Sequence, residues 1–210
     1  MACSAFPFLT LTEFECACQA IADRCTSAQD GWSIRLLTKP GVGFRVIKYI
    51  SGSEMPDPRS QEDDPVCELS ASKDVSTRSD SSPQEALVRT QPSLQVDYDI
   101  LLSATYQVPV LYFGLRSHNH GPLGLDEVYQ YVVPEQYRQE LKSVGVMGGI
   151  SMGYHPDSGA PAFFVHPCNT ADAMAHLADA KSVTPGSYLL IWLGLVGHCV
   201  NLHVPREYFV

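Results

Sequence analysis

The chain has 210 residues, of which 45% are hydrophobic, and its formal net charge is −9. This length suits a single domain over residues 1–210 with a sizeable buried core. The acidic balance argues against nucleic acid as a partner, because phosphate contacts need clustered Lys and Arg. No apolar run is long enough to span a bilayer, so we expect no transmembrane segment.

The seven cysteines indicate a reducing compartment. An odd count without regular spacing favours free thiols over a disulfide framework. The N-terminus lacks the basic start and the apolar stretch of a signal peptide, so we expect a cytoplasmic protein. Cys16 and Cys18 have no later pair at the spacing of a zinc site, and no metal is therefore expected.

The N-terminal region predicts a helix followed by a hairpin. Residues 9–25 repeat apolar side chains every three or four positions, and Thr10 or Thr12 can cap this helix. Residues 32–37 and 43–50 alternate apolar side chains on either side of the turn sequence KPGVG. This pattern is typical of an antiparallel strand pair.

The composition changes abruptly at residues 51–93. This segment has no aromatic residue, ten serines, five prolines, nine acidic residues and four basic ones. Such a segment cannot bury enough apolar surface to offset the entropy of ordering it. We predict a disordered, acidic insertion between two strands, and it is also a candidate for phosphorylation or partner docking.

The rest of the chain predicts strands and then helices. The stretches LQVDYDILLSATY and VPVLYFGLR predict a second antiparallel pair, and residues 96–116 are expected to offer a docking edge. Helices are expected at residues 125–131, 169–181 and 187–200, the last one buried. The fold class is therefore α+β, an antiparallel meander of about four strands with N-terminal and C-terminal helices.

Cys168 lies where an apolar run, AFFV, stops and a helical pattern starts. Asn169 can cap the helix, and Asp172 three residues later completes a capping box. The unpaired N–H groups of a helix start carry partial positive charge and stabilise a thiolate. Pro167 lacks a backbone donor, which places Cys168 outside a strand ladder. The corner leaves two interpretations of Cys168 open, a nucleophile and a buried structural cysteine, whereas Cys199 within an apolar helix is expected to be structural.

Three blocks of sequence share a recognisable order. The triplet HPC at Cys168 follows the aromatic run FFV, and YDILLSATYQVPVLYF and GYHPDSGAP lie upstream. Over about residues 94–205 these blocks resemble the autophagy-related ubiquitin-like-conjugating enzymes. The spelling of the strand pair and the short chain are closer to the member that modifies a lysine of a single acceptor protein than to the lipid-conjugating relative.

The resemblance implies a core like that of ubiquitin-conjugating enzymes and a thioester relay. Cys168 would accept the C-terminal glycine of a ubiquitin-like modifier from an activating enzyme. It would hold the acyl group until a lysine of the acceptor protein attacks and an isopeptide bond forms. The implied partners are the modifier, its activating enzyme and an acceptor bound directly. No cofactor is expected, since ATP is used by the upstream activating enzyme.

The transfer step needs donors for the oxyanion and a site that deprotonates the lysine. Ordinary ubiquitin-conjugating enzymes place a His-Pro-Asn triplet before the cysteine. This chain instead has HPD at residues 155–157, and an ionised aspartate cannot donate a hydrogen bond. The candidate helpers are His166, Tyr106 and Asn169, beside backbone N–H groups at the helix start.

Three alternatives remain open at this stage. The first is the lipid-conjugating relative of the same family. The second is a cysteine hydrolase that pairs Cys168 with a distant histidine, although none of the seven histidines lies in a protease-like signature. The third is a non-catalytic binding module on the same fold, in which Cys168 is inert.

Overall fold

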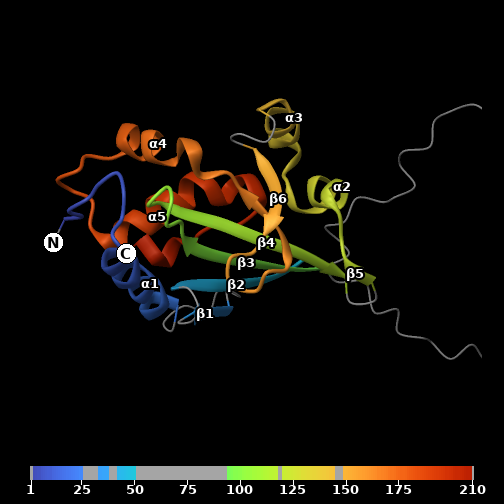
Figure 1. Ribbon diagram of the computed structural model, residues 1–210, viewed down its shortest axis with the longest axis horizontal. Helices are drawn as coiled ribbons and strands as arrows, with labels where there is room; N and C mark the ends of the chain where they lie inside the picture. The colour runs from blue at the N-terminus through green and yellow to red at the C-terminus, as the bar shows by residue number, and fades with distance from the viewer. Residues whose placement is uncertain are drawn as a thin grey trace, which may run out of the picture.

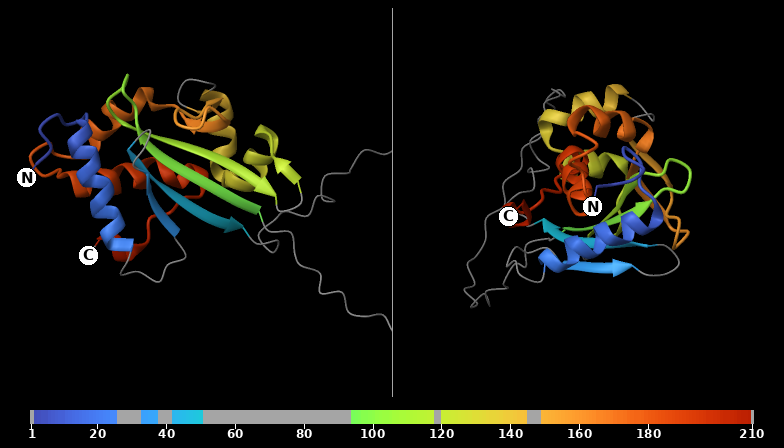
Figure 2. Two further views of the ribbon diagram at one scale, coloured as in Figure 1. Left: turned by 60° about the horizontal axis from the view of Figure 1, so that its bottom comes forward. Right: turned by 90° about the vertical axis from the view of Figure 1, so that its left-hand side faces the viewer.

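The computed structural model describes residues 2–25, 33–37, 42–50, 94–117, 120–144 and 149–209. The predicted insertion at residues 51–93 lies outside these ranges. The α+β class is confirmed, because one antiparallel sheet is flanked by helices from both ends of the chain, as Figure 1 and Figure 2 show.

The first helix, α1 (Leu11–Cys25), forms with the cap that the sequence predicts. Thr10 Oγ1 accepts a hydrogen bond from the backbone N–H of Glu13 (3.3 Å), and Glu13 Oε2 accepts one from the N–H of Thr10 (2.9 Å). This reciprocal pair satisfies two donors at the helix start. Phe14, Cys18 and Ile21 share the buried face of the helix. That face packs against the C-terminal helix α5 (Pro185–Val196).

The predicted meander is present. It consists of four strands, each antiparallel to the next: β1 (Ser33–Leu37), β2 (Gly43–Ile50), β3 (Leu94–Leu102) and β4 (Pro109–Ser117). At one end of the central pair, Ile50 and Leu94 are directly opposite partners. Ile50 and Leu94 therefore lie side by side at the same end of the sheet.

The sheet is larger than the expected four strands. Its order is β1-β2-β3-β4-β7-β6, where β6 is Ile150–Tyr154 and β7 is Pro161–Val165, and a short strand, β5 (His120–Pro122), also pairs with β4. Glycines and prolines around β6 and β7 interrupt the alternation by which strands are predicted. The expected docking edge at residues 96–116 is wrong: in the part of the chain that the structure describes, β3 pairs with β2 and β4, β4 pairs also with β7 and β5, and the outer strands are β1 and β6.

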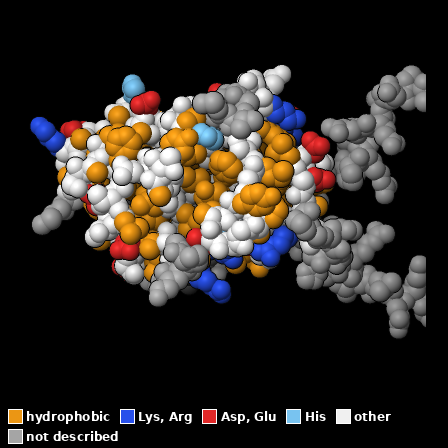
Figure 3. All heavy atoms as spheres, in the orientation of Figure 1, with side chains coloured by type: hydrophobic (Ala, Val, Ile, Leu, Met, Phe, Trp, Pro, Cys, Tyr) orange, Lys and Arg blue, Asp and Glu red, His pale blue; other side chains and the backbone are white. Residues whose placement is uncertain are grey.

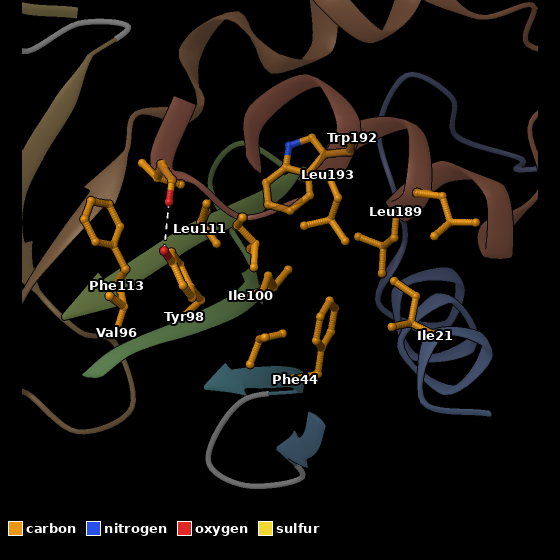
Figure 4. Close-up of a cluster of buried hydrophobic side chains, with 14 of the residues drawn as sticks. Ile21, Phe44, Val96, Tyr98, Ile100, Leu111, Phe113, Leu189, Trp192 and Leu193 are labelled. Atoms are coloured by element: carbon orange, nitrogen blue, oxygen red, sulfur yellow. Dashed lines mark hydrogen bonds between the residues drawn. The ribbon is translucent and has the colours of Figure 1, made fainter. Parts of the chain in front are cut away.

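Alternation along the strands divides the sheet into two different faces. Val96, Tyr98 and Ile100 on β3 are fully buried, and Figure 4 shows Ile100 toward Trp192 and Leu193 of α5, whereas Val96 lies beside Phe113. The Tyr98 hydroxyl donates to the carbonyl of Val200 (2.8 Å), which satisfies the one polar atom of this ring. On the opposite face, β3 carries carboxylates instead of apolar side chains.

The remaining helices follow in the order of the chain. A short α2 (Leu125–Glu127) continues into a π-helical turn (Val128–Val132), as the sequence predicts a helix there, and α3 (Glu135–Val144) follows. The predicted helix at residues 169–181 is shorter, since α4 (Thr170–Leu177) ends where Ala178 is extended. The predicted apolar helix is α5 followed by a 3-10 turn (Gly197–Val200).

Candidate active site

Cys168 lies in a 3-10 turn (Pro167–Asn169) that joins strand β7 to helix α4. The strand ends at Val165, and Pro167 has no N–H with which to continue the ladder. The thiol is free and its residue is partly exposed. The expected strand-to-helix corner is therefore present, with the cysteine at its centre.

His166 organises this turn. Its backbone is extended (φ −66°, ψ 129°), and its Nδ1 accepts a hydrogen bond from the backbone N–H of Cys168 (3.2 Å). The backbone N–H of His166 donates to the backbone carbonyl of Gly149 (3.2 Å), and this hydrogen bond attaches the turn to the residue before β6. Because Nδ1 accepts, the proton of the neutral ring lies on Nε2. His166 therefore caps the turn and keeps one donor available.

The predicted cap at Asn169 is wrong. Asn169 stands before the first residue of α4, but its side chain makes no capping hydrogen bond. Its backbone (φ −99°, ψ 0°) continues the 3-10 turn, whereas a capping side chain needs the extended conformation that His166 has. The predicted capping box with Asp172 is consequently not formed.

Tyr106 comes to the same place from the link between β3 and β4. Its ring stands edge-on to the ring of His166, with 5.8 Å between centroids and 78° between planes. The link is held by Gln107, whose backbone is left-handed (φ 53°) and whose carbonyl accepts from the N–H of Leu9 (2.8 Å). Tyr106 is 41% exposed, so its hydroxyl is accessible to a partner. The structure thus brings Tyr106 and His166 together.

A cavity of about 200 Å³ adjoins the turn. It is lined by His166, Asn169 and Thr170 on one side and by Trp192 and Cys199 on the other. Burial raises the pKa of the Cys199 thiol to about 11, so this cysteine stays protonated at neutral pH, in keeping with a structural role. Among the described residues, no three His, Cys, Asp or Glu side chains gather to hold a metal ion.

Sequence reasoning missed a polar group on the outer face of the sheet. His155 Nε2 lies 3.1 Å from Asp99 Oδ2, and both side chains are 8% exposed. Asp99 also accepts two hydrogen bonds from Arg45, at 2.6 Å each. The sequence does not predict this group. Asp97 and Asp99 alternate with apolar residues along a strand, as polar side chains on the other face of any such strand do.

The surface around the turn is partly apolar. Figure 3 shows hydrophobic side chains over the middle of one face, with Lys and Arg side chains toward its margin. The exposed large apolar residues include Tyr106, Met152 and Tyr154. Such a face suits contact with another protein. None of the helices found among the described residues has the length and hydropathy that a membrane crossing requires.

The chain matches the family described as "Autophagocytosis associated protein, active-site domain" over residues 13–207. It is similar to the ubiquitin-like-conjugating enzyme ATG10 of Gibberella zeae, with 39% identity over 70% of this chain and 63% of that protein. It is also similar to the enzyme of the same name from Homo sapiens, with 34% identity over 55% of this chain and 52% of that protein. The matched region thus spans between half and two thirds of these relatives.

Proposed function

Because the chain belongs to the family of autophagocytosis-associated proteins with this active-site domain, we propose that it is a ubiquitin-like-conjugating enzyme that works through a thioester at Cys168. The modifier reaches Cys168 from the cysteine of an activating enzyme, which has used ATP to activate it. This chain needs no cofactor of its own. The acceptor protein binds directly, and the reaction takes place in the cytoplasm.

The position of Cys168 carries the proposal. Among the cysteines whose side chains the structure describes, Cys3 and Cys18 are buried and Cys199 lines the inner wall of a cavity. Cys16 is exposed on α1, away from any strand-to-helix turn. Cys168 alone among them combines partial exposure with a turn capped by a histidine and flanked by a tyrosine.

The chemistry of transfer is an acyl exchange. The amine of an acceptor lysine attacks the thioester carbonyl carbon, the carbonyl oxygen becomes an oxyanion, and collapse breaks the C–S bond. Cys168 leaves as a thiolate, and the amine loses its proton as the isopeptide bond forms. The backbone N–H of Cys168 already donates to His166. The candidate donors for the oxyanion are therefore His166 Nε2–H, the Tyr106 hydroxyl and the other backbone N–H groups at the helix start.

A charging reaction tests the proposal. Purified chain, activating enzyme, modifier and ATP should give an adduct on a non-reducing gel that dithiothreitol removes. Cys168→Ser should give a more stable oxyester, and Cys168→Ala should give no adduct. Cys16→Ser is the matched control, since it removes an exposed thiol, and it should charge like the wild type. A reductant-sensitive adduct that persists in Cys168→Ala would refute the assignment.

The same reaction separates two of the alternatives, the cysteine hydrolase and the non-catalytic module. A cysteine hydrolase would cleave a conjugate without ATP and would not accumulate an adduct. A non-catalytic module would give no adduct in the wild type.

A further inference from the structure

A continuous row of rings crosses the outer face of the sheet and ends at the active-site turn. His155 contacts Tyr112 (5.4 Å between centroids), and Tyr112 contacts Phe164 (5.6 Å). Phe164 contacts His166 (6.1 Å), whose other neighbour is Tyr106 (5.8 Å). Aromatic pairs at these separations attract one another and hold their relative orientation. The row therefore connects the β6–β7 hairpin loop to the turn of Cys168.

The hairpin made by β6 and β7 has little backbone attachment to the rest of the sheet. Strand β7 pairs with β4 at only two positions, Tyr112 with Phe164 and Phe113 with Phe163. Strand β6 is an edge and pairs only with β7. Since β7 runs directly into the 3-10 turn, the angle at which the hairpin lies on the sheet also sets the position of Cys168.

His155 supplies a second attachment. Its Nδ1 accepts from the backbone N–H groups of Asp157 (3.2 Å) and Ser158 (3.3 Å), which shapes the hairpin loop. In the neutral ring the proton then lies on Nε2, which is 3.1 Å from Asp99 Oδ2, an electrostatic contact without the geometry of a hydrogen bond. Asp99 itself accepts hydrogen bonds from Nε and Nη2 of Arg45. The hairpin loop is thereby tied to β2 and β3 through one buried carboxylate.

We propose that the contact between Asp99 and His155 is a positioning clamp for the transfer step. By fixing the hairpin on the sheet, it keeps His166 and the Cys168 turn against Tyr106. The inference rests on the proposed function, and neither Asp99 nor His155 touches the reacting atoms.

Two substitutions of His155 separate its two roles. His155→Asn keeps an acceptor where Nδ1 stood, and so keeps the loop, but it cannot reach Asp99. His155→Gln extends an amide donor toward Asp99 but loses the acceptor for the loop. Asp99→Asn removes the carboxylate from the other side. Asp97→Asn is the matched control, since Asp97 is equally buried on the same strand and face but is paired with Arg116 and Gln95.

Single-turnover kinetics measure the effect on each step. His155→Asn and Asp99→Asn should transfer the modifier about ten- to a hundredfold more slowly, as a small displacement of reacting groups does. Their charging rates should stay within about twofold of the wild type, because the Cys168 thiol attacks as a thiolate and does not need the deprotonation that a lysine amine needs. His155→Gln should recover part of the transfer rate, and Asp97→Asn should transfer at the wild-type rate. Equal losses in Asp97→Asn and Asp99→Asn, or a wild-type rate in His155→Asn, would overturn the clamp.

A measurement without activity distinguishes this inference from the proposed function. The ring nitrogen chemical shifts of His155 in the unmodified chain should show the Nε2–H tautomer, and Asp99→Asn should shift the Nε2 signal more than Asp97→Asn does. An Nδ1–H tautomer would overturn the clamp even if the enzyme is active. A wild-type chain that never forms an adduct would overturn the proposed function while leaving these signals intact.

Discussion

His166 has two nitrogen atoms with different tasks. Nδ1 accepts a hydrogen bond from the backbone N–H of Cys168 and fixes the turn, while Nε2 carries the single N–H proton of the neutral ring. Replacing His166 therefore removes a cap and a donor together. Tyr106 is simpler, since its ring packs against His166 and its hydroxyl is not needed for that contact. Asn169 makes no capping bond that a substitution could remove.

These differences predict three separate outcomes in discharge kinetics. Tyr106→Phe should charge and melt like the wild type but transfer about a hundredfold more slowly if its hydroxyl donates to the oxyanion, the usual cost of one such donor. His166→Ala should lose transfer to at least the same extent and also about 1 kcal/mol of stability with the cap. Asn169→Ala, the control within the same turn, should change both least.

Rate constants for charging and discharge, with melting temperatures, decide among these outcomes. Parallel losses of charging, discharge and stability in Tyr106→Phe would assign that residue a structural role only. Wild-type discharge in all three variants would place the oxyanion against backbone N–H groups instead.

At the scale of elements, the sequence predicts what depends on local pattern. The cap of α1 follows from Thr10 and Glu13, and the meander follows from the alternation around Tyr98 and Tyr112. Strands β6 and β7 are harder to predict, because each has only five residues and their sequences contain or adjoin Gly and Pro. Their position beside β4 depends on tertiary contacts, which no local sequence pattern predicts.

The candidate site is also predicted only in part by the sequence. Pro167 and the apolar run before it predict the corner at Cys168, because proline ends the ladder locally. The cap was assigned to Asn169 because asparagine is a common capping residue, but the backbone of the 3-10 turn gives that task to His166. The contact between Asp99 and His155 joins residues far apart in sequence, and only the folded sheet brings them together.

The N-terminal cap of α1 predicts a pH dependence of stability. Burial raises the pKa of Glu13, but hydrogen bonds from the backbone and side chains of Thr10 and Ser4 outweigh it, and the net pKa is lowered. A lowered pKa in the folded state means that the stabilisation is complete above the unfolded value of about 4.3 and is lost as the pH falls through the folded value.

Glu13→Gln should therefore destabilise the chain by about 1 kcal/mol at pH 7, as the loss of a cap does. The difference from the wild type should shrink at an acidic pH below the lowered folded-state pKa of Glu13, because protonated Glu13 resembles glutamine. Urea unfolding of both chains at the two pH values measures this. A difference of equal size at both would show that the carboxylate charge does not stabilise the cap.

At the scale of the whole molecule, the residues on both sides of the segment at 51–93 form one sheet. Strands β2 and β3 pair along their full lengths, from Gly43 opposite Leu101 to Ile50 opposite Leu94. The family match at residues 13–207 also runs across the segment. The segment itself holds nine of the acidic residues and no aromatic residue. The described core includes Val46 and Val96 on those two strands.

Deleting residues 54–90 should consequently leave folding and charging nearly intact. The six residues that remain between Ile50 and Leu94 are enough to join two adjacent antiparallel strands. A shorter connection costs less entropy to close. At about 0.6 kcal/mol for each halving of its length, the deletion should raise the free energy of unfolding by about 1–2 kcal/mol. Thermal unfolding and single-turnover charging of the deleted and full chains measure both effects. Loss of the cooperative transition would show that the segment contributes to the core, whereas intact melting with slower transfer to the acceptor would assign it a part in partner docking.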